Sequence, residues 1–145
     1  MSFWEGVFTN KAIILPLVSW LMAQVYKFGF HLIVNKKIDF KKLVSSGGMP
    51  SSHSAISVCL ASVLGMKYGF DSGYFALAVI LAFVVMADAA GVRRAAGKQA
   101  EVLNRLVNSS RQLHLEKDLK ELLGHTPVQV FIGAALGIVI AVIFA

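Results

Sequence analysis

The side chains that could do chemistry lie in three short clusters, and the first is the run Pro50-Ser51-Ser52-His53 at the start of an apolar stretch. Proline suits the first position of a helix, and either serine can cap it by accepting hydrogen bonds from its first amides. These amides and the positive end of the helix dipole form a site that attracts an anion. His53 would face the same anion. The alternative is a plain helix cap with a solvated histidine.

The second cluster contains an acid and three bases near the end of another apolar stretch: Asp88, Arg93, Arg94 and Lys98. An acid in such a place is costly unless it is paired or functional. Arg94 and Lys98 are four residues apart and share a helix face. Arginine holds phosphate through two parallel hydrogen bonds, and lysine adds a point charge. We therefore expect Arg94 to face the anion and Arg93 to face solvent or a lipid headgroup. The alternative is a stop-transfer cluster in which an arginine only neutralises Asp88.

The third cluster is His125, which comes shortly before the last apolar stretch. A lone histidine there is more often a solvated interface residue, but the expected topology brings His53, His125 and the arginines to one membrane face. Histidine can act as a nucleophile or a proton donor near neutral pH. We predict a phosphate site with imidazoles about 5–8 Å apart, so that one phosphate fits between them. Two histidines with Asp88 could ligate zinc, but the arginines would repel a cation; no metal and no cofactor is expected.

The composition places these clusters in a membrane protein. The chain has 145 residues, of which 57% are hydrophobic and 15% are charged, against about 25% charged residues in a typical soluble domain. A soluble domain of this size could not bury so much apolar side chain, and the same figures exclude disorder. The single cysteine excludes a disulfide within the chain. The net charge of +6 reports membrane topology rather than a nucleic-acid partner.

Four apolar stretches could cross a bilayer, about residues 12–34, 51–68, 73–92 and 127–145. Even the second, with 18 residues, would rise about 27 Å as a helix, which is just enough to span. The polar segments between them cover about residues 35–50 and 93–126. Residues 93–113 carry apolar side chains at helical offsets, which predicts an amphipathic helix at the interface or extending the third span. We predict an all-α integral membrane fold in a single domain: a bundle of about four transmembrane helices plus an amphipathic interfacial helix.

Two further patterns concern orientation and packing. Four spans put both polar segments on one side with eleven basic residues, against Lys11 and Lys67 on the other side, while Lys27 lies within the first stretch. The positive-inside rule makes the basic side, and with it the site, cytoplasmic. Gly133 and Gly137 form a GxxxG pattern, which predicts a close helix-packing face within or between subunits. The eleven basic residues are Lys36, Lys37, Lys41, Lys42, Arg93, Arg94, Lys98, Arg105, Arg111, Lys117 and Lys120.

Three segments resemble a known family. The run from Met49 to His53, Met-Pro-Ser-Ser-His, resembles the Pro-Ser-Gly-His motif of the type-2 phosphatidate phosphatase superfamily, which also includes the vanadium haloperoxidases. Residues 125–137 resemble its final His-x3-Asp motif with the trailing glycine-rich helix. Residues 88–104 are similar to a divergent small branch of that superfamily, known mostly from bacteria and plastids. The resemblance covers about residues 41–145.

The resemblance implies a role for each matching position. The histidine that matches His125 attacks phosphorus, and the one that matches His53 protonates the leaving alcohol. Lys98 joins the phosphate ligands through the face that it shares with Arg94. The resemblance implies these further phosphate ligands: Ser51, Ser52, Arg93 or Arg94, and Lys41 or Lys42.

The chain departs from the family pattern in three places. The first motif, Lys-x6-Arg-Pro, is not present as such, and Ser52 replaces the motif glycine. Gln129 occupies the place of the aspartate that orients the nucleophilic histidine. A neutral amide cannot stabilise an imidazolium as a carboxylate does, although it can accept a hydrogen bond and hold the ring. Asp88 or Glu101 could supply the missing charge. The chain is also shorter than the usual six-helix core, so a homodimer would complete the packing.

These patterns predict an integral protein of the bacterial plasma membrane that hydrolyses a lipid phosphate without a metal. The reaction would pass through a phosphohistidine at the cytoplasmic face, in contact with membrane lipids. Phosphatidate, phosphatidylglycerol phosphate and polyprenyl phosphates all remain candidate substrates. The alternative is a non-catalytic membrane protein that binds anionic lipid headgroups; the missing aspartate favours it and the pair of histidines opposes it. A carrier or channel subunit is disfavoured because the spans contain little polar lining.

Overall fold

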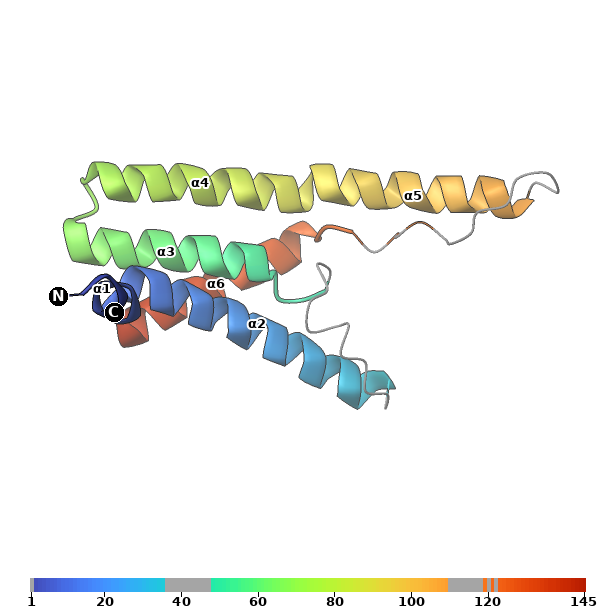
Figure 1. The fold of residues 1–145 in the computed structure, drawn as a ribbon. Helices are drawn as coiled ribbons and strands as arrows, with labels where there is room; N and C mark the ends of the chain where they lie inside the picture. Colours follow the sequence, from blue (N-terminus) through green and yellow to red (C-terminus); the bar gives the residue numbers. More distant parts are fainter. Residues whose placement is uncertain (1, 36–47, 110–118, 120, 122) are drawn as a thin grey trace.

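The computed structural model describes residues 2–35, 48–109, 119, 121 and 123–145, and the regular structure in these ranges is entirely helical. The predicted all-α class is therefore confirmed. Figure 1 shows the helices in chain order. They are α1 (Phe3–Thr9), α2 (Lys11–Asn35), α3 (Ser52–Tyr68), α4 (Gly73–Ala90), α5 (Val92–Ser109) and α6 (Pro127–Phe144).

Helix α3 is the centre of the bundle and packs against α2, α4 and α6. Its buried positions carry mostly small side chains, which let neighbouring helices approach closely. The closest approach is to α6, where Gly133 lies against the backbone of Ser51 and Gly137 lies against the backbones of Ala55 and Cys59. The predicted packing role of these glycines is confirmed, and the packing occurs within one chain.

Within the described residues, three segments are long and apolar enough to cross a membrane: Lys11–Ile33, Gly73–Ser109 and Pro127–Phe144. Helix α3 has 17 residues, which gives a length of about 26 Å, so its crossing remains a prediction. The outer surface is apolar: Leu77, Ile80 and Phe83 on α4 are each more than 60% exposed. A surface of this kind suits contact with lipid rather than water.

Helix α5 continues almost in line with α4 (Figure 1). Gly91 separates the two helices, and its N–H donates to the Ala87 carbonyl at 2.8 Å. Of the two placements expected for the amphipathic helix, the structure has the extension of the third apolar stretch. Its buried face consists of Gly97, Ala100 and Asn104.

The bundle has two different ends. The chain termini and the turn between α3 and α4 lie at one end (Figure 1). The start of α3, the junction of α4 with α5 and the start of α6 lie at the other end. The fold therefore brings the three chemical clusters of the sequence to the same end of the bundle.

Candidate functional site

Ser51 ties the start of α3 to α6. Its Oγ accepts a hydrogen bond from the Ser54 N–H at 3.3 Å and another from the Ser54 hydroxyl at 3.0 Å. Its own N–H donates to the Gln129 carbonyl at 3.0 Å. Both serines are fully buried. Ser51 is thus the helix cap, and it holds the first turn of α3, with His53 as its second residue, in a fixed position beside α6.

The two histidines face each other across the end of the bundle. The ring centroids of His53 and His125 are 6.0 Å apart, within the range expected from the sequence. His125 is only 2% exposed, and its backbone N–H donates to the Ala89 carbonyl at 2.9 Å. Among the described residues, no well-aligned hydrogen bond reaches either ring nitrogen of His125 or Nδ1 of His53. The Gln129 side chain and the Gly48 backbone still lie near enough to the His125 ring to raise its pKa. Unpartnered buried nitrogens are costly, so this pair of rings is well suited to receive a polar ligand.

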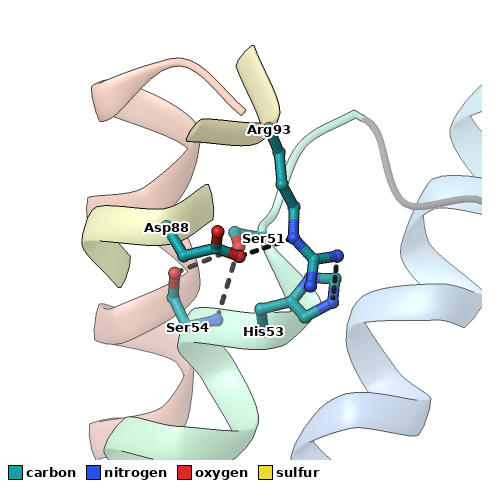
Figure 2. A network of polar contacts seen from close by, with 5 residues as sticks. All are labelled: Ser51, His53, Ser54, Asp88 and Arg93. Carbon is teal, nitrogen blue, oxygen red and sulfur yellow. Dashed lines mark hydrogen bonds and ion pairs between the residues drawn. The ribbon is translucent and has the colours of Figure 1, made fainter. Parts of the chain in front are cut away.

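Arg93 connects the α4–α5 junction to His53 (Figure 2). Its Nε donates to Asp88 Oδ2 at 2.6 Å, and its Nη1 lies 3.4 Å from His53 Nε2. The pairing of Asp88 with an arginine, which the sequence left as an alternative, is therefore present. The same ion pair also aims the guanidinium at the histidine (Figure 2).

The expectation that Arg94 faces the site is wrong, because Arg93 is the arginine that meets His53. Arg94 and Lys98 are exposed, and the backbone of Arg94 lies against Gly124. The physical reason is the break at Gly91, which sets the rotation of α5 relative to α4. Spacing within α5 correctly places Arg94 and Lys98 on one face but does not show which face meets α3.

Lys27 is a site residue that the sequence reasoning missed. It lies on α2, is 6% exposed, and its Nζ donates to Ser52 Oγ at 3.3 Å. In the sequence, Lys27 only interrupts the first apolar stretch. A charge inside a span is by default a functional candidate, and that signal could have identified it. Lys41 and Lys42, the expected lysine ligands, lie outside the described residues.

Burial keeps His125 in its neutral form. Burial lowers the pKa of the His125 imidazole, and the positive charge of Lys27 and the nearby His53 lower it further. Gln129 and the backbone of Gly48 oppose this shift, but more weakly. A neutral imidazole has the free electron pair that a nucleophile needs.

Gln129 uses its amide oxygen elsewhere. Its Oε1 accepts from the Thr126 N–H at 3.0 Å, and its own N–H donates to Thr126 Oγ1 at 3.4 Å, which forms a capping box at the start of α6. Asp88 and Glu101 pair with Arg93 and Arg105 respectively. The expected compensation for the motif aspartate is therefore not present among these residues. Within the described ranges, no three His, Cys, Asp or Glu side chains lie close enough together to hold a metal ion.

Comparison with known proteins identifies the family of this chain. The sequence model of the divergent PAP2 family matches residues 8–140. The chain belongs to this family. It is also 40% identical over 150 residues to the uncharacterized membrane protein YuiD of Bacillus subtilis (strain 168), an alignment that covers 94% of this chain and 95% of that protein. No solved structure matches. The predicted branch membership is confirmed, the chain is a membrane protein related to phosphatases, and the family match includes α2 with Lys27.

Proposed function

We propose that this divergent PAP2 protein is a metal-independent lipid phosphate phosphatase that works through a phosphohistidine at the cytoplasmic face of the membrane. The observation that carries the proposal is the pair of imidazoles 6.0 Å apart with a cation on either helix that flanks them, Arg93 on α5 and Lys27 on α2. This spacing leaves room for one phosphate. Family membership supports the same class of chemistry.

The first step is capture of the phosphate. Lys27 and Arg93 offset its negative charge, and the first amides of α3 add hydrogen bonds at the positive end of the helix dipole. Arg93 Nη1 lies 3.4 Å from His53 Nε2. A phosphate oxygen is a better acceptor for a guanidinium than a neutral imidazole. Binding therefore draws Arg93 onto the phosphate and frees that nitrogen of His53 to carry a proton.

The second step is transfer of the phosphoryl group. A ring nitrogen of His125 forms a bond to phosphorus while the bond from phosphorus to the lipid oxygen breaks. His53 gives its proton to that oxygen, and the alcohol leaves. Water then attacks the phosphohistidine while His53 takes a proton from it, which releases inorganic phosphate and restores both rings.

A second function, capture of anionic lipid headgroups without turnover, has one observation in its favour. Gln129, at the place of the family aspartate, caps α6 through Thr126, and among the described residues no carboxylate forms an ion pair with His125. An imidazolium that forms there would lack the carboxylate that normally stabilises it. The two functions use the same residues and differ only in whether phosphate is released.

The deciding experiment is phosphate release from a panel of lipid phosphates by the purified protein with a chelator present. We expect release by the wild type and none by His125→Ala, while Asn108→Ala, at an exposed position of α5, remains active. Retained binding of lipid phosphates with no release from any of them would establish the headgroup-binding function instead.

The cytoplasmic orientation rests on the basic bias of the polar segments and has its own test. Lys37 and Gln112 lie in those segments, outside the described residues. Cysteines placed there should react with an impermeant thiol reagent only after the cells are opened. Labelling of both positions in intact cells would reverse the orientation and leave the chemistry of the site unchanged.

A further inference from the structure

Four described residues between α5 and His125 lie outside the helices and contact α5. We call these residues, Leu119, Glu121, Leu123 and Gly124, the strap. Figure 1 shows it beside α5 as it approaches α6. The strap residues are not helical, so no helical hydrogen bonds hold them in place. The contacts that fix it to α5 therefore determine where His125 lies.

Asn104 makes the polar part of this attachment. It is 3% exposed and lies with Gly97 and Ala100 on the buried face of α5. Its Nδ2 donates to the Leu119 carbonyl at 2.8 Å, and its Oδ1 accepts from the Leu119 N–H at 2.9 Å. Nδ2 also donates to Glu121 Oε1 at 2.8 Å. One side-chain amide thus satisfies both backbone groups of Leu119, and asparagine can do so because it carries a donor and an acceptor.

Gly97 makes the steric part of the attachment. A Cβ at this position would collide with the Glu121 carbonyl oxygen and would come within 3.1–3.2 Å of the Leu123 backbone. The strap backbone therefore lies directly on the helix at Gly97. Seven residues separate Asn104 from Gly97, which is about two helical turns, so both contacts occur on one face of α5.

Gly124 and Ala89 complete the path to the histidine. Gly124 has a φ of 77°, a left-handed conformation that glycine adopts without strain, and its Cα lies against the backbones of Arg93 and Arg94. The next residue is His125, whose N–H donates to Ala89. Helix α5 thus carries Arg93 directly and supports His125 through the strap.

We propose that Asn104 is a positioning residue, which holds the strap on α5 and thereby keeps His125 buried at its observed distance from His53. The catalytic meaning of this role rests on the proposed function, but the structural role does not. Removal of the Asn104 amide leaves the N–H and carbonyl of Leu119 without their partner. The strap then leaves α5 more often, and His125 becomes accessible.

The test measures the reaction of each histidine with diethyl pyrocarbonate, which modifies neutral imidazole, by mass spectrometry of the full-length protein in lipid nanodiscs. Asn104→Ala should raise the modification rate of His125 about tenfold or more, because local opening controls access to buried groups. The matched control is Asn108→Ala, an exposed asparagine one turn further along α5, which should leave the rate within about twofold of wild type. Equal rates for the two variants would overturn the proposal.

Gly97→Ala provides a second variant that separates positioning from general loss of fold. Alanine favours the helix more than glycine does, so α5 itself should become more stable, yet the new methyl group pushes the strap away. We expect faster modification of His125 with undiminished helix content by circular dichroism. Unchanged modification in this variant would also contradict the proposal, even if Asn104→Ala fails to fold.

The modification assay needs no substrate, so it stands apart from the proposed function. If the wild type releases phosphate, Asn104→Ala should lower kcat about 10- to 100-fold with little change in KM, because Lys27 and Arg93 still hold the phosphate. An equal loss in Asn108→Ala would refute the positioning role. If no lipid phosphate is hydrolysed but the modification rates differ as expected, the proposed function fails and the role of Asn104 stands.

Discussion

The two histidines of the site are held by different kinds of structure. His53 belongs to α3, whose first turn is capped by Ser51 and pressed against α6 at Gly133. His125 lies on a non-helical segment and reaches its position through a backbone hydrogen bond to Ala89 and the strap on α5. The first histidine is fixed by the packing of helices, and the second by a few polar contacts.

This difference separates stability from activity in the molecule. The backbones of α3 and α6 are in close contact at Gly133 and Gly137, in the centre of the bundle. Substitutions at these glycines should therefore unfold the protein. The α4–α5 junction contributes Arg93 to the site and supports His125, but it has fewer packing partners than α3. Substitutions at this junction should leave a folded protein whose candidate site is poorly formed. The following predictions test this division, from the largest expected effect to the smallest.

The largest effect is expected at Arg93. If the site binds phosphate as proposed, Arg93→Ala removes a charged group with two parallel donors and should lower kcat/KM by about 30- to 1000-fold, equivalent to about 2–4 kcal/mol of transition-state stabilisation. Arg93→Lys should recover little of the lost kcat/KM, because lysine offers a point charge where arginine donates two parallel hydrogen bonds. The control is the exposed Arg94→Ala, which should lose less than about threefold. Equal losses at the two arginines in a lipid phosphatase assay would contradict the geometry of the site.

Gly133→Ala tests the helix-packed half. The added Cβ meets the backbone of Ser51, which cannot rotate away as a side chain can, so we expect a loss of about 1–3 kcal/mol or more in the free energy of unfolding. The matched control is Gly29→Ala, where a Cβ has nothing within 4 Å. Thermal unfolding in detergent should show a lower Tm for the first variant and an unchanged or higher Tm for the second. Similar Tm values would show that the α3–α6 contact does not hold the bundle together.

Lys27→Met should affect binding more than folding. The substitution removes a charge-assisted hydrogen bond to the phosphate, so KM should rise about 10- to 100-fold. It also removes a buried charge that forms no ion pair with an acidic side chain among the described residues, so the Tm should not fall. Lys67→Met, at the far end of α3, is the control and should leave KM unchanged. A fall in Tm at constant KM would make Lys27 a structural residue rather than a phosphate ligand.

The smallest effect concerns pH. The pKa of His125 lies below the ordinary value of about 6.5 that it would have in the unfolded chain. The unfolded state therefore binds more protons between these two values, and the folded state loses stability as the pH falls through that window. The contribution is fully present above about pH 6.5. Unfolding midpoints from pH 7.5 downward should fall in the wild type and fall less steeply in His125→Gln; parallel curves would exclude this linkage.

Much of the site could be predicted from the sequence because its parts are local. The helix cap at Ser51, the close packing of Gly133 and the meeting of two histidines at one end all follow from short motifs and alternating topology. The choice between Arg93 and Arg94 could not be made, because it depends on how Gly91 rotates α5 against α4. Asn104 was missed for a similar reason: its partner Leu119 is 15 residues away, beyond the end of α5, and the pattern of α5 alone does not indicate that contact.

Gln129 and Lys27 show where residue types alone mislead. At the place of an orienting aspartate, Gln129 is expected to hold the His125 ring. In the structure its amide oxygen accepts from Thr126 and caps α6, and its side chain only weakly raises the pKa of His125. In the sequence, Lys27 is a charged residue that interrupts an apolar membrane span. In the structure it donates a hydrogen bond to Ser52. In both cases tertiary contacts decide the role, because the side chain has more than one partner within reach and only the packed structure selects between them.

The leaving group separates the roles of the two histidines. If His53 donates a proton to the departing oxygen, His53→Ala should slow hydrolysis of an alkyl phosphate far more than that of a phosphate with an acidic phenol leaving group, whose oxygen needs no proton. His125→Ala should abolish hydrolysis of both. Equal slowing of the two substrates by His53→Ala would make His53 a binding residue rather than a proton donor.

The central claim is that His125 forms a bond to phosphorus, and rapid quenching tests it most directly. The wild type is mixed with a lipid carrying a labelled phosphate group, quenched in alkali within the first turnover, and mapped by mass spectrometry. The account predicts an alkali-stable, acid-labile phosphoryl group on His125 that appears before free phosphate and is absent from His125→Ala. Release of free phosphate at the full rate without any phosphohistidine, or with the label on His53, would contradict it.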